Sequence, residues 1–231
     1  MITRLLRFVV GILLIPAAAG ATWTLADLLK GLQAASLATV PTSVWALVGG
    51  FVLWVFLYAT LPRPVRSYVL AHELTHALWA WLMGARVRGL RVSGDQGSVT
   101  VSKSNFLITL APYFFPLYTV LVIVAYYVLS VFVDVGGYYL FWLGAIGFTW
   151  GFHFTFTIST LMQHQSDISE CGHVFSYAVI YLCNVLGICL WVVIVSSATV
   201  EDLVQGLQGH TLDLARWLAA GISRLVAHWR Q

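Results

Sequence analysis

Residues 65–84 read VRSYVLAHELTHALWAWLMG, an apolar stretch with His72, Glu73 and His76 near its middle. In a helix, residues at positions i and i+4 lie on one face, so both imidazoles can reach one metal ion. Glu73 then flanks that face, next to the place of a metal-bound water. The His-Glu-x-x-His pattern is typical of zinc hydrolases, and here it predicts a zinc site inside a membrane helix.

The composition indicates an integral membrane protein. Of the 231 residues, 60% are hydrophobic and 9% are charged, whereas ordinary soluble domains contain roughly 25% charged residues. A membrane-spanning helix needs about 20 apolar residues. Apolar runs of about this length lie at 5–21, 44–61, 65–84, 106–132, 138–162 and 174–197. The sequence therefore predicts an all-α polytopic membrane protein with about six transmembrane helices.

The first apolar run allows two interpretations. Arg4 and Arg7 precede it and small residues occupy 17–21, a pattern that a cleaved secretory signal also shows. We favour an uncleaved membrane span for this run.

The segment after the motif predicts a membrane-associated β-hairpin at about residues 86–103. Residues 86–92 and 98–103 both alternate in character, and SGDQG separates them at 93–97. A plain solvent-exposed loop decoration is the alternative. A strand edge beside a catalytic site can bind an extended peptide through backbone hydrogen bonds, which suits a protease that must unwind a helix before cutting it.

The fourth apolar run contains Pro112 and Pro116. Proline removes a backbone hydrogen-bond donor, so neighbouring groups or a wet cavity must satisfy the freed carbonyls. We expect a kinked or widened helix there, either as an ordinary membrane-helix kink or as room near the metal.

The remaining organisation is simple. Residues 201–231 mix leucine and tryptophan with arginine and predict an amphipathic interfacial helix, interrupted near Gly206 to Gly209. We expect one transmembrane domain over 1–200 and a helical tail over 201–231. The formal charge of +3 comes from scattered basic residues, so nucleic acid is not expected as a partner. Substrate choice then falls to the membrane body, the hairpin or an adaptor or regulatory protein.

A catalytic zinc ion normally has three protein ligands, so His72 and His76 need one more. The candidates in or near the apolar runs are Asp134, His153, His164, Asp167, Glu170 and His173. Asp167 is the preferred ligand, because it follows the fifth run on the side expected for the hairpin. One alternative is that Asp167 and Glu170 form a capping box of the next helix, with no metal involved. Another is that Glu170 or His173, and after them His164, supplies the ligand. A buried thiol without metal is the favoured interpretation of Cys171.

His153 lies deeper in its run than the other candidates. It is either an ordinary buried histidine or a group that hydrogen-bonds a reaction intermediate or the second nitrogen of a metal ligand. Both interpretations stay open at this point.

With these features the chain resembles the site-2 protease family of intramembrane zinc metalloproteases, peptidase family M50. The resemblance rests on His72-Glu73-x-x-His76 in a hydrophobic helix, the hairpin after it, the proline-containing next run and a late acidic residue. It implies one Zn²⁺ per chain bound by His72, His76 and Asp167, with Glu73 as catalytic base. The family's Asn-Pro-rich segment ending in Asp-Gly is absent, since Ile168 follows Asp167.

The resemblance implies an intramembrane metalloprotease that cuts transmembrane protein substrates within a lipid bilayer, in a bacterial or archaeal cell membrane. Two other functions stay open. One is a catalytically silent relative that binds a membrane partner, and the other is a zinc-dependent membrane hydrolase of a non-peptide substrate.

Overall fold

The computed structural model describes residues 2–34 and 40–229, which form two compact units. One unit comprises residues 41–171 and contains all three predicted metal ligands. The other combines the described parts of residues 1–40 and 172–231. The predicted division into 1–200 and 201–231 stays a prediction, and residues 230–231 of the predicted tail lie outside the described residues.

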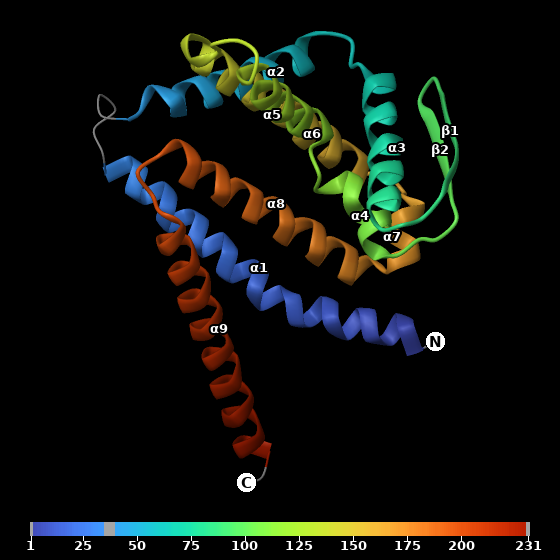
Figure 1. Ribbon diagram of the computed structural model, residues 1–231. Coiled ribbons are helices and arrows are strands. Elements are labelled where there is room, and N and C mark those ends of the chain that lie inside the picture. Colours follow the sequence, from blue (N-terminus) through green and yellow to red (C-terminus); the bar gives the residue numbers. More distant parts are fainter. Residues whose placement is uncertain (1, 35–39, 230–231) are drawn as a thin grey trace. The chain divides into compact units, whose positions relative to one another are not determined.

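The unit 41–171 consists of short and long helices and one hairpin (Figure 1). Its helices are α2 (Thr42–Thr60), α3 (Val65–Leu82), α4 (Phe106–Leu110), α5 (Leu117–Ser130), α6 (Tyr139–Leu161) and α7 (Ser166–Cys171). Two 3₁₀ turns, Ala111–Tyr113 and Gly136–Tyr138, precede α5 and α6.

Helices α2 and α6 pack backbone to backbone, and glycine makes this approach possible. A methyl group added to Gly50 would overlap the carbonyl of Gly144, and one added to Gly147 would overlap the carbonyl of Leu47. Small residues are the usual means of close helix contact in membranes. Beside this contact, Trp54 lies in a buried aromatic cluster and donates a hydrogen bond to Thr155 at 2.9 Å.

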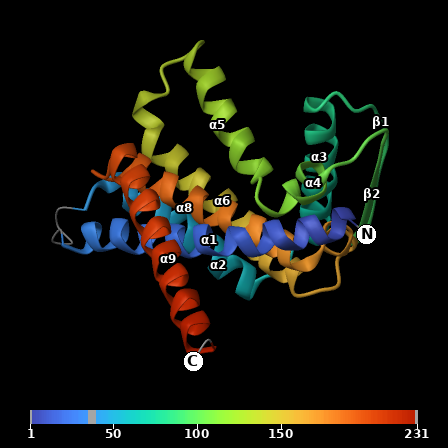
Figure 2. The same cartoon turned by 90° about the horizontal axis from the view of Figure 1, so that it is seen from below.

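The predicted hairpin is confirmed, and both views place it along α3 (Figures 1 and 2). Helix α3 ends at Leu82, and Gly84 takes a positive φ of 71°, the left-handed conformation that commonly terminates helices. Strands β1 (Val87–Ser93) and β2 (Gln96–Val101) then pair antiparallel. Because the two strands form a sheet of their own among the described residues, one edge of β2 carries no strand partner.

The expected kink in the fourth apolar run is confirmed, and it is a sharp break. Residues Phe106–Tyr113 and Leu117–Phe132 meet at an angle of 83°. Pro112 lies in the 3₁₀ turn and Pro116 immediately precedes α5. The missing proline donors explain why the helix cannot continue through this segment.

The second unit contains three long helices, α1 (Ile2–Ala34), α8 (His173–Val195) and α9 (Val200–Trp229). They share an apolar core formed by Ala21, Leu28, Val185, Cys189, Val192 and Leu203. The interruption predicted near Gly206 to Gly209 is wrong, because α9 is continuous there. Gly206 instead allows close contact, since an added methyl group would lie 2.7 Å from Cγ2 of Thr24.

Three described helices are long and apolar enough to cross a membrane: α1 over Thr3–Gly31, α2 and α8. The count becomes four if the broken pair around Pro112 is one span. The prediction of about six spans is therefore not confirmed. Helices α3 and α6 do not meet this test of length and apolarity, and α3 carries Arg66, His72, Glu73 and His76 within its 18 residues.

Candidate metal centre and substrate groove

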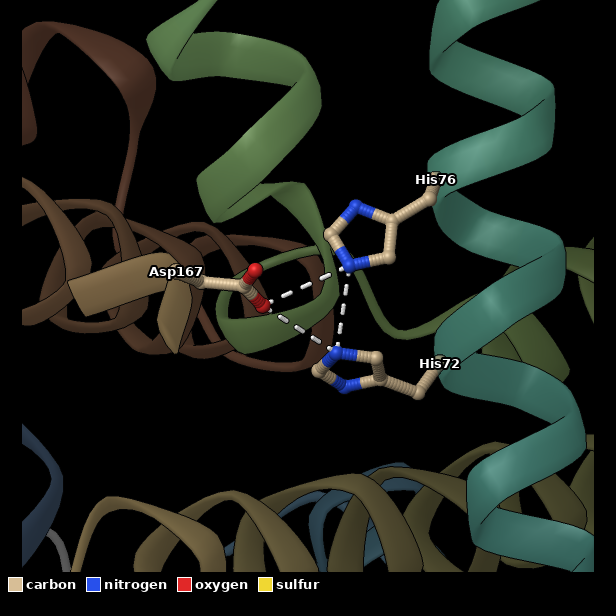
Figure 3. A group of neighbouring side chains, drawn as sticks. All are labelled: His72, His76 and Asp167. Atoms are coloured by element: carbon tan, nitrogen blue, oxygen red, sulfur yellow. Dashed lines mark hydrogen bonds and ion pairs between the residues drawn. The ribbon is translucent and has the colours of Figure 1, made fainter. Parts of the chain in front are cut away.

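Two elements bring the predicted ligands together (Figure 3). Helix α3 presents His72 and His76 on one face, and Asp167 reaches them from the first turn of α7. The two Nε2 atoms lie 3.2 Å apart. Each lies 3.4 Å from Oδ2 of Asp167. Among the described residues, these three form the group of side chains able to hold a metal ion.

The donor set fits zinc. Tetrahedral zinc sites have ligand distances of about 2.0–2.2 Å, which places neighbouring ligand atoms about 3.3–3.5 Å apart. The three measured separations, 3.2, 3.4 and 3.4 Å, are close to that range. Two imidazole nitrogens and one carboxylate oxygen are also a common protein contribution to a catalytic zinc site, which keeps a fourth position open.

His76 turns Nε2 toward the other two ligands, and its second ring nitrogen, Nδ1, has a close hydrogen-bond partner. Nδ1 of His76 lies 2.8 Å from the carbonyl oxygen of Ile108. In a regular helix this carbonyl would accept the backbone N–H of residue 112, but residue 112 is proline and has no N–H. The break in the helix therefore frees the acceptor that keeps the proton of His76 on Nδ1 and turns Nε2 toward the other ligands.

The corresponding nitrogen of His72, Nδ1, has a more distant hydrogen-bond partner. Its Nδ1 lies 3.4 Å from the hydroxyl of Tyr68, which is beyond the usual hydrogen-bond range. The ring is also packed edge-on against Tyr113, with centroids 5.3 Å apart. The two histidines thus differ in how strongly hydrogen bonds at their Nδ1 atoms orient the rings.

Asp167 is oriented by Tyr113, a residue that the sequence analysis did not single out. The fully buried Tyr113 hydroxyl donates a hydrogen bond to Oδ2 of Asp167 at 3.0 Å. Burial raises the pKa of Asp167, but the neighbouring imidazoles of His72 and His76 outweigh it and hold the pKa below its usual range. Asp167 is therefore a carboxylate at neutral pH, the form that binds metal.

The alternative role of Asp167 as a helix cap is not observed. Helix α8 begins at His173 with Gly172 as its N-cap and has no side-chain cap, while Asp167 belongs to α7. The other ligand candidates occupy different places. Glu170 lines the groove described below, the ring of His164 lies 3.5 Å from Oγ of Ser169, and Asp134 accepts the N–H of Gly136. His173 belongs to the other unit, and Cys171 is buried.

A groove of about 690 Å³ opens onto the three ligands. Glu73 lies in its wall and is itself 8% exposed. Strand β2 contributes Gly97, Ser98, Val99 and Val101 to the lining, which also includes Thr160, Gln163 and Gln165. A methyl group added to Gly97 would lie 2.5 Å from Cγ and 2.8 Å from Oε1 of Glu73. The hairpin backbone therefore packs directly against the Glu73 side chain.

The sequence of residues 42–209 matches the model of the Peptidase M50B-like family. The chain belongs to this family. The search of curated proteins and the search of solved structures found no match. Membership in the family, whose members are zinc metallopeptidases, agrees with a metal-binding group at His72, His76 and Asp167. Together with the three apolar helices, it identifies this M50B-like chain as an integral membrane protein.

Proposed function

We propose that the chain is an intramembrane zinc metalloprotease that hydrolyses peptide bonds of membrane-embedded proteins. The observation that carries the proposal is the meeting of His72, His76 and Asp167 at tetrahedral spacing, with Glu73 in the wall of the same groove. Such a site needs an open position for water and a nearby general base. The groove that opens onto the three ligands and contains Glu73 supports both requirements.

Each residue has a distinct role in the proposed reaction. His72, His76 and Asp167 would hold a zinc ion, which would supply the Lewis acidity that activates water at neutral pH and polarises a peptide carbonyl. Glu73 accepts the proton of the attacking water and later donates it to the departing amine, so it acts first as base and then as acid. Ile108 and Tyr113 orient His76 and Asp167 through the hydrogen bonds described above.

The groove suits an extended substrate. Strand β2 lines it and has one edge without a strand partner among the described residues. A peptide segment can add to such an edge through backbone hydrogen bonds, which tolerate many side-chain sequences. We therefore expect a substrate helix to unwind next to β2 before its scissile carbonyl reaches the metal centre beside Glu73. An adaptor or regulatory protein remains a further proposed partner.

Zinc content per purified chain, measured together with cleavage of a transmembrane model peptide, tests the proposal. We expect about one zinc in the wild type and its loss, with cleavage, in His72→Ala and Asp167→Ala. Glu73→Gln should keep the zinc but lower cleavage by roughly 10²–10⁴-fold, because only the proton acceptor is removed. His164→Ala is the matched control, since this exposed histidine lies three residues before Asp167 and outside the metal-binding group.

The outcomes separate the competing functions. A wild-type chain without zinc or cleavage would favour the catalytically silent partner-binding protein. Zinc binding without cleavage of any peptide, combined with Glu73-dependent hydrolysis of a lipid or small amide, would favour the hydrolase of a non-peptide substrate. Retention of zinc in Asp167→Ala would assign the third ligand to another residue, with Glu170 as the first candidate because it lines the same groove.

A further inference from the structure

His153 has a buried nitrogen without a hydrogen-bond partner among the described residues. The side chain lies on α6 and is 7% exposed. Its Nε2 makes no hydrogen bond within the part of the chain that the structure describes. Leaving a buried polar atom unsatisfied is energetically unfavourable, so native structures usually pair such atoms with protein groups or ordered water.

This nitrogen belongs to a residue that lines a small cavity of about 10 Å³. Helix α3 contributes His72 and Thr75 to the cavity, the broken helix contributes Pro112 and Tyr118, and α6 contributes His153. The volume is close to the minimum of about 10–15 Å³ that one water molecule needs. Polar side chains from two helices are available to hold that water.

His72 lines both this cavity and the substrate groove. Among the described residues, Nδ1 of His72 has only the distant Tyr68 hydroxyl at 3.4 Å, whereas Nδ1 of His76 has a carbonyl at 2.8 Å. A histidine that binds metal through Nε2 normally donates its Nδ1–H to a firm acceptor. The poorly fixed metal ligand and the unpaired buried histidine therefore border the same space.

We propose that one water molecule in this cavity links Nδ1 of His72 to Nε2 of His153, which makes His153 a positioning residue for the metal ligand. The water accepts the Nδ1–H of His72 and donates one hydrogen to Nε2 of His153. Its second hydrogen goes to Oγ1 of Thr75. Because this hydroxyl donates its one hydrogen to the carbonyl of Ala71 at 2.7 Å, its oxygen can only accept a hydrogen bond from the water. This inference rests on the proposed zinc site.

The test is the zinc dissociation constant of the full chain, measured by competition with a chromophoric chelator, together with the visible spectrum of the Co²⁺-substituted protein. His153→Leu removes the acceptor, and we expect zinc binding to weaken by about 10–100-fold, as is usual when the outer partner of a metal ligand is lost. His153→Gln keeps a polar partner for the water and should recover most of the affinity and the wild-type Co²⁺ spectrum.

Thr157→Val is the matched control. Thr157 lies one turn further along α6, is 4% exposed and also has a buried oxygen without a partner among the described residues, but it does not line the cavity. Its substitution should leave zinc affinity unchanged. If His153→Leu does not fold, Thr75→Val tests the same water from the opposite wall and should weaken zinc binding by a few-fold.

Wild-type zinc affinity in His153→Leu, or in Thr75→Val where that variant replaces it, would overturn the inference while the metal site stands. Equal losses in the cavity variant and Thr157→Val would also overturn it, because both would then reflect general disturbance of the buried interior. A wild-type chain that binds no zinc would refute the proposed function and this inference together.

Discussion

The two compact units differ in how regular their backbones are. The unit of α1, α8 and α9 uses three helices of 33, 23 and 30 residues. The unit 41–171 contains a helix pair bent by 83°, a separate helix of six residues and a two-stranded hairpin. The candidate metal ligands all lie in the irregular unit. Breaks in helices free carbonyls and strand edges, and these groups can orient ligands or hold a substrate.

The units also differ in the setting of their charged groups. In the helical unit, Asp27 pairs with Lys30 and His210 at 2.8 Å, but the Asp27 side chain is 52% exposed. Exposed pairs of this kind contribute little to stability. In the irregular unit, Glu73 and His76 are buried and Asp167 is half-buried beside them. We therefore expect substitutions near the metal centre of the irregular unit to change zinc binding or peptide cleavage. Substitutions in the helical unit should change thermal stability alone.

The largest effect that sharpens this contrast is expected for Gly97→Ala. The added methyl group would collide with Cγ and Oε1 of Glu73, so the carboxylate or the hairpin must move. A misplacement of about 1 Å can cost roughly 100-fold in rate. We expect peptide cleavage to fall by about that factor at unchanged zinc content. Gly89→Ala, in the partner strand with open space around it, is the control. Equal activity of both variants would show that the hairpin does not position Glu73.

Several features of this site could be predicted from the sequence because they depend on local periodicity. The spacing of His72 and His76 placed both rings on one helical face, and the alternation after the motif indicated the hairpin. Few ionisable residues lie in or near the apolar runs, which favours Asp167 as the third ligand, and the structure places it beside both histidines. The role of these residues as zinc ligands stays a prediction.

Other features depend on contacts between distant residues. Tyr113 and Asp167 are 54 positions apart, and nothing in the local sequence signals their hydrogen bond. The carbonyl of Ile108 becomes a partner of His76 through folding, although Pro112 signalled that some carbonyl would be freed. Gly206 looked like a helix break, but its contact with Thr24 favours glycine inside a continuous helix. The count of about six spans is not confirmed, because α3 and α6 carry polar residues that keep them below the apolarity expected of a membrane span.

A smaller effect is expected for Pro112→Ala. The new backbone N–H would compete with His76 for the carbonyl of Ile108. A carbonyl oxygen has two lone pairs and can accept both hydrogen bonds. We therefore expect zinc affinity to fall by about tenfold, which is the smallest loss usually seen when the hydrogen-bond partner of a metal ligand is changed. Chelator competition measures it. Pro116→Ala, at the same break, leaves Ile108 without a new competitor and should bind zinc like the wild type. A similar loss in both variants would indicate that the break acts through overall shape.

The smallest effect is expected in the helical unit, for Thr199→Ala. Thr199 and Asp202 form a reciprocal cap at the start of α9: Oγ1 of Thr199 accepts the N–H of Asp202 at 3.1 Å, and Oδ2 of Asp202 accepts the N–H of Thr199 at 2.8 Å. Loss of such a cap should lower the melting temperature by about 2 °C. Zinc affinity and cleavage should not change. Ser197→Ala, two residues earlier and exposed, is the control.

The pH dependence of the Thr199→Ala effect tests its cause. Hydrogen bonds from the Thr199 side chain and backbone lower the pKa of Asp202 in the folded state. The cap therefore stabilises the fold above the ordinary aspartate pKa, and this contribution is lost as the pH falls through the folded-state pKa. Melting curves of the variant and the wild type should converge in acid. If Thr199→Ala instead weakened zinc binding at neutral pH, the helical unit would take part in the chemistry, and the contrast between the two units would no longer hold.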